Sequence, residues 1–187
     1  MPRETNDGSV IWQVTMSLDG YIAADGDDMG WIFEYIDPSN PAGAEVPARI
    51  GSMIAGRRSF DVGARDGMEV YDGSWSGAQF LMTNRPSADL PGGLRVRSGP
   101  VRQVVEEALD AAGGRDVGII GADIARQALE SNLVDEVVVH VAPVLLGDGV
   151  RFRGALGRKD LRLVDTARHG EVVTAHYRVP HGQRAEP

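Results

Sequence analysis

Residues 116–149 read DVGIIGADIARQALESNLVDEVVVHVAPVLLGDG, and this stretch decides the fold class of the chain. Its two apolar runs, 117–120 and 137–146, have the composition of buried strands, and the residues after Gly121 have helical spacing. A strand, a helix and a second strand in this order predict a parallel unit of an α/β fold. Gly121 lies where the strand gives way to the helix, and the free N–H groups of such a helix start attract phosphate.

The composition is that of one ordinary globular domain. Of the 187 residues 42% are hydrophobic and 25% are charged, which predicts a single domain over 1–187 with frayed tails at 1–8 and 181–187. The net charge of −8 argues against a surface built for nucleic acid or an anionic membrane. Because the chain has no cysteine, no signal-like start and no long apolar span, we expect a cytoplasmic protein without disulfides.

Further strands and helices are expected on both sides of the opening stretch. Strands are predicted at 10–16, 21–23, 53–55, 79–83, 94–96, 161–167 and 172–179. Helices are predicted within 41–52, after Gly56 and, most clearly, from Pro100 to Gly113, whereas the glycine-rich run 61–77 is expected to be a long loop. Strands that alternate with helices and end in a hairpin predict a mostly parallel sheet with helices on both faces and an antiparallel edge.

Several common catalytic motifs are missing. There is no GxGxxG, and the P-loop-like spacing after Gly51 ends in Arg57 and Arg58 in place of lysine and a hydroxyl residue. The motif GSWSG carries Trp75 where a nucleophilic serine would stand. The four histidines lack metal-ligand spacing, so no metal site is predicted, and for His140 in its valine-rich strand a core role outweighs a catalytic one.

Glycines, arginines and hydroxyl residues follow three of the predicted strands. They are GRRS at 56–59, TNR at 83–85 and GAD at 121–123. Two helix starts and two sources of arginine near parallel strand ends would suit a polyanionic ligand such as a phosphorylated cofactor. The alternative is that these are merely exposed loop side chains. Asp19 also follows a strand, where it either contributes to a site or only shapes the turn.

Five motifs together resemble the dihydrofolate reductase superfamily, and most closely the RibD C-terminal reductase domain of riboflavin biosynthesis and its stand-alone relatives. They are SLDGYIA (17–23), MIAGRRSFDVG (53–63), LMTNRP (81–86), IIGADIARQAL (119–129) and LVDEVVVHVAPVLLGDGVRF (133–152). The resemblance implies a three-layer fold with a central mixed sheet of about eight strands. It also implies an NADPH-dependent reductase of a pyrimidine, pterin or related heterocycle, similar to 5-amino-6-(5-phosphoribosylamino)uracil reductase.

The resemblance also implies roles for individual residues. Cofactor contacts fall on Thr15, Ile22, Gly56, Arg57, Ser59, Thr83, Asn84, Arg85, Gly121, Ala122, Asp123 and Ile124. Among them, Gly56, Arg57 and Ser59 would grip phosphates, 83–85 would lie by the adenosine 2′-phosphate, and Thr15 and Ile22 would lie along the nicotinamide. Ala122 is a departure, because the family's pattern has a glycine pair before this helix. Asp19 is the catalytic candidate, and the candidates for substrate binding are Trp31, Glu34 and Asp37.

Two classes of function stay open from the sequence. The first is the reductase, in which the nicotinamide donates the hydride and the protein needs no catalytic dyad. The second is a non-catalytic, dimeric cofactor-binding or regulatory protein with the same fold. A homodimer is expected under either, because the apolar strand 137–146 and the C-terminal hairpin would offer a long sheet edge.

Overall fold

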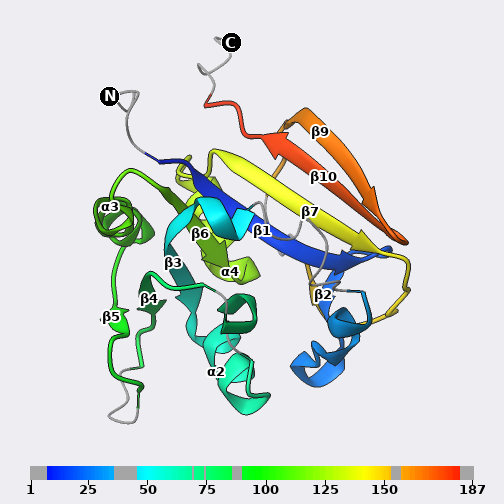
Figure 1. The fold of residues 1–187 in the computed structure, drawn as a ribbon, viewed down its shortest axis with the longest axis horizontal. Coiled ribbons are helices and arrows are strands. Elements are labelled where there is room, and N and C mark those ends of the chain that lie inside the picture. The colour runs from blue at the N-terminus through cyan, green and yellow to red at the C-terminus, as the bar shows by residue number, and fades with distance from the viewer. Residues whose placement is uncertain are drawn as a thin grey trace.

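The computed structural model describes residues 8–35, 46–68, 70–73, 75–85, 90–152 and 157–181 (Figure 1). Its strands are β1 (Val10–Ser17), β2 (Tyr21–Ala23), β3 (Ile50–Gly56), β4 (Ala78–Met82), β5 (Arg95–Arg97), β6 (Asp116–Ile120), β7 (Glu136–Ala142), β8 (Val150–Arg151), β9 (Arg162–His169) and β10 (Val172–Arg178). The longer helices are α2 (Arg57–Arg65), α3 (Val101–Ala112) and α4 (Ala122–Glu130), and short 3-10 helices occupy Asp25–Asp27, Gly30–Glu34 and Val70–Gly73. Among these residues no helix combines the length and the apolar character needed to cross a bilayer.

Eight strands form one twisted sheet in the order β5-β4-β3-β6-β1-β7-β10-β9, and β2 and β8 form a separate two-stranded ribbon. Five pairings in the large sheet are parallel, and the two made by β10 are antiparallel. The predicted mixed sheet with a C-terminal antiparallel hairpin is therefore confirmed. The central strand is β1, which pairs with both β6 and β7.

Alternation along the strands produces apolar packing on both faces of the sheet. Val10 and Trp12 of β1 face the cluster under α3 and α4, whereas Ile11 between them faces a second cluster with Val46 and Ile50. On α3, the buried positions Val101, Val104, Val105, Ala108 and Ala112 follow helical spacing. The helix ends at Gly113, whose φ of 62° is the left-handed conformation that glycine tolerates.

Four elements differ from their predictions. β3 begins at Ile50, because Ile50 and Ser52 are buried and pair with β6, so the predicted helix survives only at 46–49 and its start lies outside the described residues. The predicted loop after Asp61 is helical as far as Arg65, since Val62 packs inward. β7 ends at Ala142, before Pro143, which has no N–H to give to a ladder. β7 also lies inside the sheet between β1 and β10, so it offers no edge.

Candidate functional site

The strand order creates a crevice at the carboxyl ends of β3 and β6. From β3 the chain leaves through α2 towards β4, and from the adjacent β6 it leaves through α4 in the opposite direction, towards β7. Ligands of open α/β sheets bind where the connections diverge in this way. Gly56 and Gly121 are the N-caps of the two helices, and neither helix start has a side-chain cap. The first N–H groups of both helices are thus free of side-chain caps at the same crevice.

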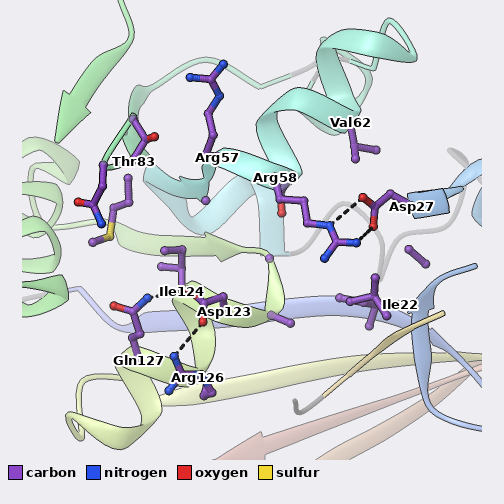
Figure 2. Close-up of a pocket in the computed structure, with 18 of the residues that line it drawn as sticks. Ile22, Asp27, Arg57, Arg58, Val62, Thr83, Asp123, Ile124, Arg126 and Gln127 are labelled. Atoms are coloured by element: carbon purple, nitrogen blue, oxygen red, sulfur yellow. Dashed lines mark hydrogen bonds and ion pairs between the residues drawn. The ribbon is translucent and has the colours of Figure 1, made fainter. Parts of the chain in front are cut away.

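A cavity of about 550 Å³ lies at this crevice (Figure 2). Its wall is formed by the ends of β3, β4 and β6, the first turns of α2 and α4, and the β2–β8 ribbon. The sequence-predicted cofactor residues that line it are Ile22, Gly56, Arg57, Ser59, Thr83, Asn84, Arg85, Gly121, Ala122, Asp123 and Ile124. Segments that are far apart in the sequence therefore meet at one place, and only Thr15 of the predicted set is not part of this wall.

The two N-cap glycines let the helix starts approach each other. A Cβ atom on Gly56 would lie 3.1 Å from Cγ1 of Ile124 in α4, and one on Gly121 would overlap Oγ of Ser59 in α2. Gly121 also has a φ of 97°, which side-chain-bearing residues rarely adopt. Each glycine thus makes room for the first turn of the other helix.

The cavity is more positive than the chain as a whole. Five arginines and two aspartates line it, in a chain with a net charge of −8. Arg57 connects two of the strand ends: its Nε donates to Asp61 Oδ1 over 2.7 Å, and its Nη1 donates to the Arg85 carbonyl over 3.1 Å. The Arg85 backbone N–H in turn donates to Thr83 Oγ1 over 3.0 Å, which folds the end of β4 towards α2.

An ion pair connects α2 with the turn after β2. The Arg58 guanidinium makes two contacts with the Asp27 carboxylate, 2.6 Å from Nη2 and 2.7 Å from Nε, as Figure 2 shows. This hydrogen bonding raises the pKa of Arg58 above its ordinary value. One face of α2 holds the whole turn, because Arg65 donates to the carbonyls of Gly26 and Asp27.

Asp123 in the first turn of α4 is paired within its own helix. Its carboxylate accepts hydrogen bonds from Arg126 and Gln127, each 2.8 Å long. The bond from Arg126 is the main reason that the pKa of Asp123 is lowered. The negative charge at this helix start is therefore already compensated before any ligand binds.

The structure places Asp19 away from the cavity wall. Asp19 Oδ1 accepts a hydrogen bond of 2.6 Å from the Ser17 hydroxyl, and the carboxylate also accepts from the backbone N–H groups of Leu146 and Gly147. These bonds, that of Ser17 foremost, lower the pKa of Asp19 to about 2. The side chain fixes the chain after β7 to the turn between β1 and β2, which favours the structural alternative over the catalytic one.

The candidate substrate residues are not brought to the cavity either. Trp31 and Glu34 belong to the 3-10 helix Gly30–Glu34 and are not among the lining residues, while Asp37 lies outside the described residues. The indole N–H of Trp31 is buried and has no hydrogen-bond partner in the described structure.

The lining also includes residues that the sequence did not indicate. Asp27 and Arg126 could have been suspected from their closeness to the predicted motifs, whereas Arg58 lies within the predicted segment 56–59. Arg151 could not, because only the pairing of β2 with β8 brings it there. Its guanidinium lies 4.6 Å from the centre of the Tyr21 ring and donates to the Tyr21 hydroxyl over 2.8 Å.

His140 has the core role that its strand suggested. Nδ1 lies 2.8 Å from the Thr174 hydroxyl and Nε2 lies 2.9 Å from the Gln13 side-chain nitrogen. A neutral ring with its proton on Nδ1 satisfies both contacts. Burial, with a smaller effect of nearby His169, lowers the pKa of His140 to about 4.

Proteins of known structure and family share features with this chain. Residues 100–175 match the model of the RibD C-terminal domain family. A putative riboflavin biosynthesis protein from Shewanella sp. PV-4 has a similar structure, with a TM-score of 0.79 and 22% identity over 92% of this chain and 99% of that one. The resemblance to RibD-type proteins inferred from the motifs is thereby confirmed.

Two further structures extend the likeness to reductases. The Thermotoga maritima diaminohydroxyphosphoribosylaminopyrimidine deaminase/5-amino-6-(5-phosphoribosylamino)uracil reductase has a TM-score of 0.69 and 13% identity, over 93% of this chain and 57% of that one. Dihydrofolate reductase from Enterococcus faecalis, complexed with NADP(H) and RAB-propyl, has a TM-score of 0.62 and 11% identity, over 92% and 97%. The chain therefore has the dihydrofolate reductase-like fold seen in RibD-type reductases.

Proposed function

We propose that this protein is an NADPH-dependent reductase that transfers hydride to a pyrimidine, pterin or related heterocycle, in the manner of 5-amino-6-(5-phosphoribosylamino)uracil reductase. The observation that carries the proposal is the convergence of two helix starts and four arginine-bearing segments on one cavity at the crevice between β3 and β6. Free N–H groups and arginines at such a place suit the phosphates of a dinucleotide.

The lining residues divide into regions that match the parts of NADPH. The close approach of Gly121 and Ser59, with the free N–H groups of α2 and α4, suits the pyrophosphate. Arg57 and Arg85, held together at the end of β4, suit the adenosine 2′-phosphate. Ile22, on the ribbon that forms another wall, would flank the nicotinamide.

When bound, the reduced nicotinamide supplies a hydride to an electrophilic carbon of the heterocycle. The chain's own contribution is to orient the cofactor and the substrate and to exclude water from the cavity. The apolar groups of Ile22, Met29 and Val150 line the ribbon side of the cavity beside Arg151 and would help to exclude water from the nicotinamide, while the arginines would hold the phosphates. We assign no residue as a general acid or base, and the proposed role of the protein is to position the cofactor and the substrate.

The structural neighbours support the proposal through their own described activities. The Thermotoga protein is a deaminase and reductase, and the Enterococcus enzyme was seen with NADP(H). The assignment of cofactor and substrate to this chain rests on the cavity itself.

Two measurements test the proposal. Calorimetric titration should show NADPH binding more tightly than NADH, and a panel of pyrimidines and pterins with NADPH should include one that causes loss of absorbance at 340 nm. An Arg95→Ala variant, altered on β5 outside the cavity wall, should behave as the parent does. NADPH binding without NADPH oxidation across the panel would favour the non-catalytic, regulatory alternative. Failure to bind either NADPH or NADH would exclude both the reductase and this alternative.

A further inference from the structure

The arginines that line the cavity differ in whether a carboxylate of the chain already compensates their charge. Three of them are ion-paired with other described residues, namely Arg57, Arg58 and Arg126. Arg85 and Arg151 also line the cavity, and within the described part of the chain neither makes an ion pair. Arg85 lies with Arg57 at the end of β4, where the 2′-phosphate is proposed to bind. Arg151 has no part in that phosphate site, so its charge is available to a different ligand.

Two contacts with Tyr21 hold the Arg151 side chain in place. Its Nη2 donates to the Tyr21 hydroxyl over 2.8 Å, and its guanidinium lies 4.6 Å from the centre of the Tyr21 ring. Tyr21 is buried, and its hydroxyl in turn donates to the Gly147 carbonyl over 3.1 Å. The other N–H groups of the Arg151 guanidinium have no acceptor among the described residues. The side chain is therefore oriented before a ligand binds, which lowers the entropy cost of binding.

Arg151 belongs to the side of the cavity opposite the proposed 2′-phosphate site. In the β2–β8 ribbon it pairs with Tyr21, whose neighbour on β2 is Ile22. Ile22 is the residue proposed to flank the nicotinamide, and Figure 2 shows it across the cavity from Thr83. A hydride acceptor must lie against the nicotinamide for transfer to occur. An anionic group held by Arg151 would therefore lie on or next to the ring that is reduced.

The charge at this end of the cavity fits a carboxylate better than a phosphate. Asp27, on the turn after β2, pairs with Arg58, so these two charges compensate each other and Arg151 is left as a single positive charge. A phosphate monoester carries about two negative charges at neutral pH, whereas a carboxylate carries one. A carboxylate also accepts paired hydrogen bonds from the planar fork of one arginine. A phosphate beside Asp27 would be compensated only in part.

We infer that Arg151 is a specificity-determining residue that binds a carboxylate carried directly on the heterocyclic ring of the substrate. The inference rests on the proposed reductase function and names the substrate class of that site, a pyrimidine or pterin carboxylate in place of a neutral base or a phosphorylated nucleotide. Tyr21 is a positioning residue, because it contacts Arg151 and is not among the residues that line the cavity.

Calorimetric titration of the protein saturated with NADP⁺ tests the inference, because the oxidised cofactor fills its site without reducing the ligand. Orotate or pterin-6-carboxylate should bind at least tenfold more tightly than uracil or pterin, which lack the carboxylate, and more tightly than uridine 5′-monophosphate. Arg151→Ala should weaken binding of the carboxylate roughly tenfold to a hundredfold and leave that of uracil and pterin unchanged. Arg151→Lys keeps the charge and should retain part of the preference.

Two further variants separate a positioning effect from damage to the fold. Tyr21→Phe keeps the ring and removes the hydroxyl, and it should weaken the carboxylate about twofold to fivefold without changing NADP⁺ affinity. Arg95→Ala is the matched control. The Arg95 guanidinium also lies over an aromatic ring, 5.3 Å from the centre of Phe80, but Arg95 is on β5 outside the cavity wall. This variant should bind every ligand as the parent does.

The possible outcomes distinguish this inference from the proposed function. If the parent binds NADP⁺ but prefers neither carboxylate, or if Arg151→Ala leaves the preference intact, the inference is overturned and the reductase proposal stands. Tighter binding of uridine 5′-monophosphate, or an equal loss of NADP⁺ affinity in Arg151→Ala, would also overturn it. If the parent binds no cofactor, the proposed function fails, and the same titrations on the protein alone decide the inference: carboxylate binding that depends on Arg151 supports it, and the lack of such binding overturns it.

Discussion

Ser59 Oγ occupies the space that a Cβ atom on Gly121 would fill, so the first turns of α2 and α4 approach each other closely at these two residues. Gly121→Ala should therefore lower the free energy of unfolding by about 2–4 kcal/mol, since it adds overlap to an unfavourable backbone conformation. It should also weaken NADPH binding, because the helix starts would separate. Denaturant unfolding and calorimetry measure the two effects.

Gly113→Ala is the matched control for this substitution. Gly113 also has a positive φ, but a Cβ atom there would meet nothing within 4 Å, so only the backbone cost of about 1 kcal/mol should appear. Ser59→Ala added to Gly121→Ala removes the overlapping oxygen and should recover part of the loss. An equal loss at positions 113 and 121, with no recovery, would mean that the helix starts are not in contact.

Arg57→Ala should separate the two nicotinamide cofactors. An arginine contact with a phosphate contributes about 1.5–3 kcal/mol, so NADPH affinity should fall roughly tenfold to a hundredfold. NADH lacks the 2′-phosphate and should be much less affected. Titration of both proteins with both cofactors measures the difference.

The interpretation of that result depends on Asp61, which Arg57 contacts within α2. Removing the arginine also leaves this carboxylate unpaired near the cavity. Asp61→Asn in the parent removes the carboxylate charge and should leave NADPH binding equal or tighter. If Arg57→Ala weakens NADPH and NADH equally, the residue serves the pyrophosphate or the fold instead.

Asp27→Asn should tighten the binding of an anionic ligand. It removes one of the two negative charges of the cavity wall and frees Arg58 from its ion pair. A gain in NADPH affinity of about fivefold is expected at low salt, and it should shrink as ionic strength rises. Unchanged or weaker binding in low salt would show that holding the 25–28 turn matters more than the charge.

Asp19 is expected to affect stability and not cofactor affinity. Because its pKa falls from 3.8 to about 2 on folding, its contribution is present above its ordinary pKa and is lost as the pH falls towards 2. Asp19→Asn should melt at a lower temperature than the parent at neutral pH, and the two should converge in acid. A large change in NADPH affinity would instead indicate that Asp19 takes part in cofactor binding.

The burial of His140 predicts a second pH range in which the stability of the fold changes. Its pKa is lowered from 6.5 to about 4 in the folded state, so protonation favours the unfolded chain. Stability should be highest above pH 6.5 and should fall by at most about 3 kcal/mol as the pH drops towards 4, at about 1.4 kcal/mol per pH unit. His140→Gln should flatten this part of the curve, and a parent curve that is already flat there would contradict the assignment.

Local patterns predicted most of the fold, because the spacing of apolar residues in α3 and in the strands shows which positions are buried. The predicted boundaries were wrong where distant contacts decide them. Ile50 joins β3 because it is buried in the second apolar cluster, and α2 continues past Asp61 because Val62 is buried. The meeting of segments 56–59, 83–85 and 121–123 at one cavity could be predicted, since each follows a strand. That Asp19, Trp31 and Glu34 are not part of the cavity wall could not be predicted, because nothing local reveals which way a turn directs its side chains.

The central position of β1 sets an order for folding during synthesis. Its neighbours β6 and β7 leave the ribosome more than a hundred residues after it, as the pairing of Val10 with Val117 shows. The half of the sheet containing β3, β4, β5 and α3 uses contacts closer in sequence and can form first. β1 must stay unpaired until β6 and β7 are made, so the newly made chain is exposed to aggregation, and its cavity cannot assemble, until residue 142 has been synthesised.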